Sequence, residues 1–284
     1  MKKLTKILSF FRWRLVPVRY AMMLGSLKWN KLFQPPPSRW ASTAEIEAKG
    51  FIKGPDVPPD LLRQALDIYG SRGQQVVPSA NGHPFVNLFN SADIHTDNPI
   101  FRFAFSSEVL DVAADYFGGC LILDSIQVLY SYPTEGPLRE SQYWHLDYGD
   151  RKSFHCVAYL RDVFTADDGP FVFVDKPTSY KVGRSMIVRR IPDQQFERKL
   201  KDGKIETFYG KAGSSVQIDP SVCYHYGSRC KTPRLAIFVT FSTWFPFAQP
   251  APIITQNAQQ ILVAARQLRP DLSKAFLQQL LQLG

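Results

Sequence analysis

The chain has 284 residues, which is enough for one large β-rich domain or two smaller units. Its 45% hydrophobic and 21% charged residues give the composition of a soluble globular protein. The four cysteines have no CxxC or other zinc-site spacing, so we expect reduced, mostly buried thiols of a cytosolic protein.

The net charge of +9 is concentrated at the N-terminus. Residues 1–44 hold nine of the 34 basic residues and none of the 25 acidic ones, so the rest of the chain is neutral. At 100° per residue, five apolar side chains of this arm share one narrow helical face: Leu4, Ile7, Leu8, Phe11 and Leu15.

Arginines interrupt every apolar run of the arm, which excludes a transmembrane helix and a cleavable signal peptide. A basic amphipathic segment with tryptophans suits a leaflet rich in anionic lipid. We therefore predict that residues 1–33 bind an anionic membrane surface, which would make the protein cytoplasmic and peripheral to the inner face of the membrane. The alternative is an arm that packs across its own domain. No nucleic-acid-binding motif accompanies the charge.

After the linker PPPS (35–38), the patterns predict a helix over 58–70 and a second, capped by serine, over 106–119, each ending at glycine. Short β-branched and aromatic runs follow, which favour an antiparallel sandwich or jelly roll: 121–132, 153–160, 170–174, 214–218 and 234–245. A long charged insertion at 181–213 is either a lid or a solvated hairpin. The predicted organisation is a basic arm (1–44), a β domain (45–250) and C-terminal helices that pack on the same domain (251–284).

Two H-x-D pairs occur in the chain, His145/Asp147 and His95/Asp97. A facial triad for non-haem Fe(II) needs two imidazoles and one carboxylate, and residues i and i+2 of an extended strand project to the same side. The first pair lies in the β region, and His225 follows a later predicted strand. The second pair lies in SADIHTDNP, where turn formers favour a loop in which an aspartate or asparagine caps its own backbone. We expect only the first pair to bind metal.

The order H-x-D, strand, DDGPFVFV (167–174), PTSYKV (177–182) and AGSSVQIDPSVCYHYGSRCKTPRLAIFVTF (212–241) resembles the phytanoyl-CoA dioxygenase type of Fe(II)/2-oxoglutarate oxygenase. The resemblance covers 121–245. It implies a fold that is mainly β with flanking helices, a double-stranded β-helix of the jelly-roll, cupin-like kind. Tyr180 and Ala236 depart from the family pattern, which often has histidine and serine there.

Carried over residue by residue, the resemblance implies that His145, Asp147 and His225 bind iron and that Arg234 pairs with the distal carboxylate of 2-oxoglutarate. A planar guanidinium makes two parallel bonds to a carboxylate, which lysine cannot reproduce. The implied cofactors are Fe(II), the co-substrate 2-oxoglutarate and O2. Gln127 and Tyr130 are candidates for a further polar contact to 2-oxoglutarate.

The implied activity is hydroxylation of an unactivated C–H bond. The basic arm and the charged insertion favour an anionic, membrane-borne substrate such as the lipopolysaccharide sugar Kdo (3-deoxy-manno-octulosonic acid), which would make the protein a bacterial Kdo hydroxylase. Alternatives are a hydroxylase of a small molecule or acyl chain, a cupin-like zinc or manganese enzyme, and a catalytically silent membrane-associated binding module. His155 alternates with Val157 and Tyr159, and we expect a hydrogen-bonded interior histidine there rather than a ligand.

Overall fold

The computed structural model describes residues 41–77, 83–133, 136–185 and 188–283, together with residues 17–18, 21–22, 24–25 and 28–29. The predicted apolar face of the arm and the PPPS linker lie outside these residues. Within the described ranges, every helix is too short or too polar to span a bilayer.

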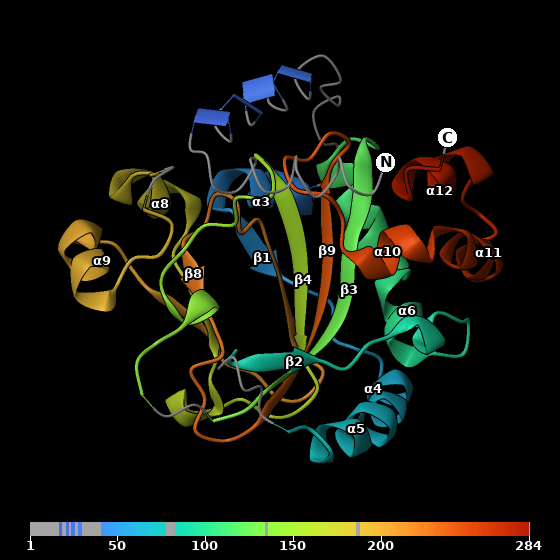
Figure 1. Ribbon diagram of the computed structural model, residues 1–284, viewed down its shortest axis with the longest axis horizontal. Coiled ribbons are helices and arrows are strands. Elements are labelled where there is room, and N and C mark those ends of the chain that lie inside the picture. The colour runs from blue at the N-terminus through green and yellow to red at the C-terminus, as the bar shows by residue number, and fades with distance from the viewer. Residues whose placement is uncertain are drawn as a thin grey trace.

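Two antiparallel sheets form the body of the protein (Figure 1). The larger has the order β1-β7-β4-β9-β3-β2. Its strands are β1 (Phe51–Lys53), β2 (Phe85–Asn87), β3 (Leu121–Ser131), β4 (Ser153–Tyr159), β7 (Ser215–Ile218) and β9 (Arg234–Thr243). The smaller sheet has the order β6-β5-β8, with β5 (Phe171–Phe173), β6 (Glu206–Phe208) and β8 (His225–Tyr226). Two facing antiparallel sheets with flanking helices confirm the predicted jelly-roll class.

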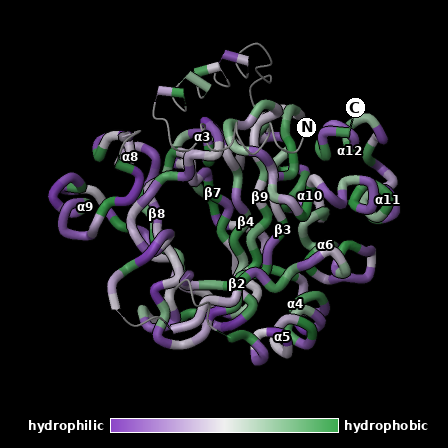
Figure 2. Tube along the Cα trace, viewed as in Figure 1, coloured by the Kyte–Doolittle hydropathy of each residue, from purple (hydrophilic) through white to green (hydrophobic). Residues whose placement is uncertain are grey.

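Helices cover one face of the large sheet because alternate residues of its central strands are apolar. Ile126 of β3, Phe154 of β4 and Val239 of β9 point into the main core with side chains of the helices, and Figure 2 shows hydrophobic residues along these strands. The helices are α3 (Ala41–Lys49), α4 (Pro59–Ala65), α5 (Ser71–Gln74), α6 (Pro99–Ala104), α7 (Val112–Tyr116), α10 (Pro252–Gln256), α11 (Ala258–Leu268) and α12 (Lys274–Leu280). The opposite face of the sheet turns toward the small sheet and carries the polar residues discussed below.

The first predicted helix is longer than expected. Gly70 does not end it, because its backbone stays helical (φ −62°) and a π-helical stretch, Leu66–Gly70, connects α4 to α5. The second predicted helix ends as expected, with Gly118 and Gly119 at positive φ. Ser106 stands at the start of that helix without a side-chain cap bond, which corrects the predicted serine cap.

The predicted insertion 181–213 is packed against the domain. It contains α9 (Asp193–Leu200), which follows α8 (Lys176–Val182), and β6. Phe196 of α9 is buried and stacks on Trp144 with ring centroids 4.0 Å apart. Ile191 also exchanges backbone hydrogen bonds with Trp144. A solvated hairpin therefore does not describe this segment, which forms part of the wall beside the H-x-D motif.

The four cysteines are free thiols, as predicted; Cys156, Cys223 and Cys230 are buried and Cys120 is half-buried.

Candidate metal centre

His225 of β8 lies directly opposite His145, which forms an isolated antiparallel bridge to it outside the named strands. The amide of each donates to the carbonyl of the other at 3.0 Å, which defines a hydrogen-bonded antiparallel pair. Side chains of such a pair project to the same side, and the two imidazole centroids are 4.2 Å apart. Two histidines far apart in the sequence are thus held side by side by the backbone.

Both imidazoles are oriented by the same kind of hydrogen bond, to the backbone carbonyl two residues earlier. Nδ1 of His145 donates to the carbonyl of Tyr143 at 2.8 Å, and Nδ1 of His225 donates to that of Cys223 at 3.0 Å. A carbonyl only accepts, so each ring carries its proton on Nδ1 and leaves Nε2 with a free lone pair. Burial, followed by the neighbouring His225, lowers the pKa of His145 to about 3, which keeps its imidazole neutral at physiological pH.

Asp147 completes the cluster. Its Oδ1 lies 3.7 Å from Nε2 of His145 and 3.9 Å from Nε2 of His225, and one ligand atom from each residue lies within 4.8 Å of the others. Burial opposes ionisation of this carboxyl, but His225, His155, His145 and Arg190 outweigh it, so the pKa of Asp147 is lowered. Two imidazoles and one carboxylate are the donor set of a facial triad for non-haem Fe(II).

The loop that leads to His225 is held by Asp219. Its Oδ1 accepts from the amides of Ser221 at 2.9 Å and Ser153 at 3.2 Å, and its Oδ2 accepts from the hydroxyl of Tyr116 at 2.8 Å. These contacts join the end of β7 to the start of β4. The amide of Asp147 also donates to the carbonyl of Pro220 at 2.9 Å. One buried carboxylate thereby fixes both loops that carry the cluster.

Arg234 opens β9 on the same face of the sheet and is only 2% exposed. Its guanidinium donates to the carbonyl of Gly169 and, at 3.1 Å, to the hydroxyl of Ser228, while its Nε has no hydrogen-bond partner in the described part of the chain. Burial lowers its pKa. A buried cation with no carboxylate paired to it among the described residues is costly, and it suits an anionic ligand with a bidentate carboxylate.

A cavity of 160 Å³ connects Arg234 to the histidines and Asp147. Leu129, Phe171 and Phe238 form its apolar wall. Ser228, whose backbone lies in the left-handed region (φ 59°), and Ser131 supply hydroxyls beside the guanidinium. The cavity joins the cluster of ligand atoms to the buried guanidinium, so the residues present would fit Fe(II) and a dicarboxylate.

Gln127 lines this cavity, as expected of a co-substrate contact, but Tyr130 does not. Tyr130 lies on the other face of β3, packed against the main core, because residues 127 and 130 have opposite parity on the strand. The structure therefore does not bring Tyr130 to Arg234. The sequence analysis did not identify Ser131 and Ser228, whose hydroxyls lie beside Arg234. Related oxygenases often have a serine at the position of Ala236, and this chain has two hydroxyls near the guanidinium from other positions.

His155 is half-buried and faces the cluster, and within the described residues its ring makes no hydrogen bond, unlike the hydrogen-bonded interior histidine that was expected. Its Nε2 lies 3.6 Å from Oδ2 of Asp147, whereas His145 and His225 lie nearer to Oδ1. Burial lowers the pKa of His155 to about 4. The alternation of His155 with Val157 on β4 was the available signal, since both lie on the face opposite the helical core.

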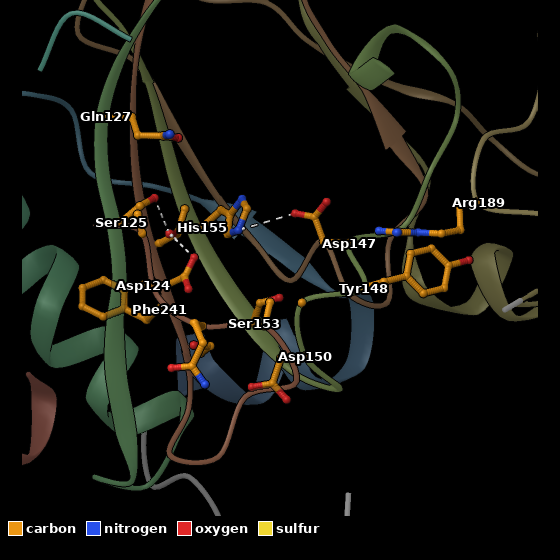
Figure 3. A pocket seen from close by; sticks show the side chains of 16 residues that line it. Asp124, Ser125, Gln127, Asp147, Tyr148, Asp150, Ser153, His155, Arg189 and Phe241 are labelled. Atoms are coloured by element: carbon orange, nitrogen blue, oxygen red, sulfur yellow. Dashed lines mark hydrogen bonds and ion pairs between the residues drawn. The ribbon is translucent and has the colours of Figure 1, made fainter. Parts of the chain in front are cut away.

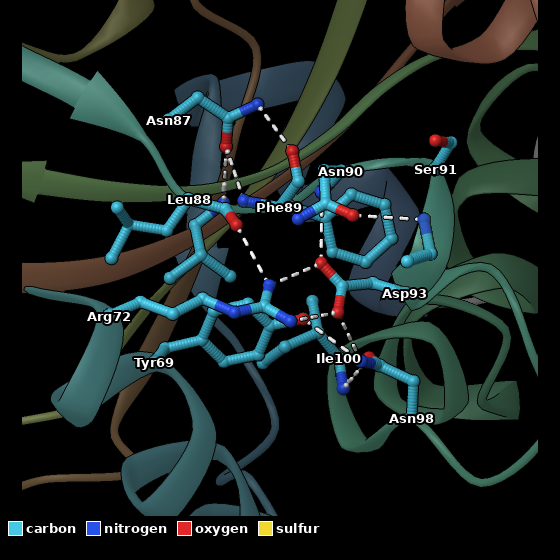
Figure 4. A network of polar contacts seen from close by, with 12 residues as sticks. Tyr69, Arg72, Asn87, Leu88, Phe89, Asn90, Ser91, Asp93, Asn98 and Ile100 are labelled. Carbon is cyan, nitrogen blue, oxygen red and sulfur yellow. Dashed lines mark hydrogen bonds and ion pairs between the residues drawn. The ribbon is translucent and has the colours of Figure 1, made fainter.

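The second pair, His95 and Asp97, is exposed in a turn. Figure 4 shows the polar network that shapes this turn. The carboxylate of Asp93 accepts hydrogen bonds from both terminal nitrogens of Arg72, at 2.6 and 2.8 Å. Asn98 accepts from the amides of Ile100 and Phe101 and so caps α6, the capping role predicted for this segment. No metal-ligand cluster among the described residues includes this pair.

A larger cavity of 380 Å³ adjoins the first, and the two share four lining residues: Gln127, Asp147, His155 and Thr240. Figure 3 shows the larger cavity between β3, which carries Asp124, Ser125 and Gln127, and the side that carries Tyr148 and Arg189. Asp147 thus borders both spaces.

No family model and no curated protein sequence matches this chain. Among solved structures, EctD from S. alaskensis with 2-oxoglutarate and 5-hydroxyectoine matches 77% of this chain and 88% of its own, with 18% identity and a TM-score of 0.54. The chain has the fold of EctD. EctD with bound Fe matches 76% of this chain and 85% of its own, at 18% identity and a TM-score of 0.53. ThoJ, a non-heme monooxygenase, matches 84% of this chain and 98% of its own, at 15% identity and a TM-score of 0.50.

Proposed function

We propose that this protein is an Fe(II)/2-oxoglutarate-dependent oxygenase of the phytanoyl-CoA dioxygenase type that hydroxylates an unactivated C–H bond. The observation that carries the proposal is the single cavity that joins the cluster of His145, Asp147 and His225 to the buried Arg234. A binding module that holds no metal has no physical need for the two histidines, Asp147 and Arg234 together. A zinc or manganese hydrolase or isomerase has no evident use for the buried guanidinium.

In this proposal, His145, Asp147 and His225 hold iron, and Arg234 binds the distal carboxylate of 2-oxoglutarate. When bound, iron with 2-oxoglutarate and O2 supplies the oxidising power, and the products are succinate, CO2 and a hydroxylated substrate. The chain fixes the histidine tautomers through two carbonyls, orients the dicarboxylate and excludes water with Phe171 and Phe238. A carboxylate at Asp147 also fills the position that a halogenase would leave open for halide, which favours hydroxylation.

For the substrate, we propose an anionic, membrane-borne, lipid-linked sugar such as Kdo. Arg189 and several hydroxyl and amide side chains line the larger cavity. The basic residues 1–33 would hold the protein at the anionic inner face of the membrane, and Val18, Met22 and Trp29 are exposed apolar side chains of this arm. Hydroxylation of a small molecule or an acyl chain is the alternative for the same site.

The decisive experiment for the class of enzyme is an anaerobic titration with Fe(II) in the presence of 2-oxoglutarate. We expect a visible metal-to-ligand charge-transfer band that saturates at one iron per chain. The His145→Ala variant should not develop the band. An absent band in the folded wild-type protein would refute the proposed function.

A further inference from the structure

Strand β3 contains a β-bulge at the edge of the larger cavity. Leu123 pairs with Phe241 and Ser125 with Thr240, so Asp124 is the extra residue without a partner on β9. A bulge re-aims the side chains of its strand, and bulges are frequent next to active sites. Leu123 and Ile126 both point into the apolar helical core, so without the extra residue only one of Asp124 and Ser125 would face the other side. With it, Asp124 and Ser125 both line the cavity.

The carboxylate of Asp124 accepts little hydrogen bonding from the protein itself. The hydroxyl of Thr240 donates to its Oδ2 at 3.2 Å, and Thr240 also shares a hydrogen bond of 2.7 Å with Ser125. In the described ranges of the chain, no basic side chain forms an ion pair with Asp124. Burial raises the pKa of Asp124 to about 6, so the fold gains nothing from this charge. A group that costs stability and faces a cavity is expected to serve a ligand.

The rest of the wall limits what that ligand is. Around Asp124 stand neutral hydroxyl and amide side chains: Ser125, Gln127, Ser153, Thr240 and Gln249. Arg189 lies on the opposite side, with its guanidinium 4.9 Å from the ring centre of Tyr148 (Figure 3). The carboxyl groups of Asp147 and Asp150 also line the cavity, so Arg189 alone does not set its charge. An alkyl chain would leave these polar groups unpaired.

We infer that Asp124 is a specificity-determining residue that accepts hydrogen bonds from neighbouring hydroxyl groups of a polyhydroxylated substrate and holds it against the metal side of the cavity. The inference rests on the proposed function, and it names the part of the site that separates a sugar from an acyl chain. Hydroxyl donors to a carboxylate form charge-assisted bonds, which are stronger than bonds between neutral groups.

The test compares two acids of eight carbons, Kdo with its hydroxyls and octanoate without them. Calorimetry on the full-length protein with Fe(II) and 2-oxoglutarate under anaerobic conditions measures both affinities. We expect wild-type protein to bind Kdo more tightly than octanoate. The Asp124→Asn variant should bind Kdo roughly ten- to a hundredfold more weakly, while its octanoate affinity is unchanged. Asp67→Asn makes the same charge change at an exposed position and should leave both affinities as they are.

Equal Kdo affinity in wild type and Asp124→Asn would overturn the inference, and so would octanoate binding at least as tight as Kdo binding. Asp124→Ser, which adds no bulk, is the second variant should the asparagine variant fail to fold. The charge-transfer band is recorded in the same samples. If the band is absent but wild type still binds Kdo more tightly than Asp124→Asn does, the oxygenase proposal is refuted and the sugar site is supported.

Discussion

His145 and His225 are separated by 80 residues and yet exchange two backbone hydrogen bonds of 3.0 Å each. In addition, each imidazole donates to a carbonyl two residues before it, at Tyr143 and Cys223. The two Nε2 lone pairs are therefore directed by the backbone before any ion arrives. Preorganised ligands lose little conformational entropy on binding, which favours a tight and selective site.

The first prediction concerns this pair. His145→Ala or His225→Ala should reduce Fe(II)-dependent succinate production to background, because one imidazole and one carboxylate no longer form a facial triad. Succinate release from 2-oxoglutarate measures the effect. His95→Ala is the control, since His95 is exposed in the turn shaped by Arg72 and Asp93. An equal loss in the folded His95→Ala protein would reverse the choice between the two H-x-D pairs.

The second prediction separates charge from geometry at Arg234. Arg234→Lys keeps the charge but loses the two-pronged contact, so the affinity for 2-oxoglutarate should fall by roughly ten- to a hundredfold, or about 1.5–3 kcal/mol. The titration of the charge-transfer band measures it.

A matched control is available nearby. Arg229 pairs both terminal nitrogens with the carboxylate of Asp193, at 2.8 and 2.7 Å, and lies over the ring of Tyr226. Arg229→Lys makes the same substitution without touching the cavity, and it should lower stability while 2-oxoglutarate affinity stays within about twofold of wild type. If Arg234→Lys binds 2-oxoglutarate as tightly as wild type, another cation must hold the distal carboxylate of 2-oxoglutarate.

Much of the fold was predictable because long strands carry strong local patterns. β3, β4 and β9 alternate between an apolar face and a mixed face, and their predicted bounds agree with the structure within two residues. The two- and three-residue strands β1, β2, β6 and β8 were not predicted, whereas the equally short β5 was, because it lies in the continuous apolar run PFVFV. Gly70 misled the helix prediction because glycine is tolerated inside a helix that tertiary contacts support.

For the candidate site, the sequence identifies residues that belong to a recurring order, such as His145 and Arg234. It does not identify residues that act through tertiary position. Ser228 contacts the guanidinium from a left-handed turn, and Asp124 and Ser125 face the cavity together only because of a bulge in the pairing of β3 with β9. A bulge depends on the partner strand, so no pattern within β3 alone predicts it.

A third prediction tests His155 as a positioning residue for Asp147. Its Nε2 lies 3.6 Å from Oδ2 of that carboxylate, so the imidazole packs beside the oxygen that does not face the other two histidines. Groups that orient a metal ligand are typically worth about ten- to a hundredfold in metal affinity. We expect His155→Ala to weaken Fe(II) binding by that factor and His155→Gln to recover part of it. Metal titration without substrate measures this. Identical Fe(II) affinity in wild type and both variants would mean that His155 contributes only to packing.

The fourth prediction is a pH dependence of stability at Asp124. Its folded-state pKa of about 6 lies above the ordinary 3.8, so the stability that it contributes is fully present below pH 3.8 and is lost as the pH rises through 6. Asparagine does not titrate. In metal-free protein, Asp124→Asn should therefore gain about 1–3 kcal/mol relative to wild type between pH 4 and pH 8. Urea unfolding at both pH values measures the difference, and a constant difference would show that Asp124 is not strained by burial.

The last prediction concerns the basic arm. If residues 1–33 bind a membrane surface, the full-length protein should sediment with vesicles that contain anionic lipid and detach partly as salt is added. Screening acts over about 8 Å at physiological ionic strength, so the charge contribution must weaken. The apolar contribution of Leu4, Ile7, Leu8 and Phe11 does not depend on salt, and some binding should persist.

Deletion of residues 1–33 separates membrane binding from catalysis. The shortened protein should turn over a soluble substrate at the wild-type rate, because Arg234 and the metal cluster lie in the body of the protein. It should turn over a vesicle-borne substrate more slowly, since it no longer concentrates at the surface. Failure of the full-length protein to bind anionic vesicles at low salt contradicts the membrane role. Unfolding on deletion would show instead that the arm packs on its own domain, and the case for a lipid-linked substrate would lose its main support.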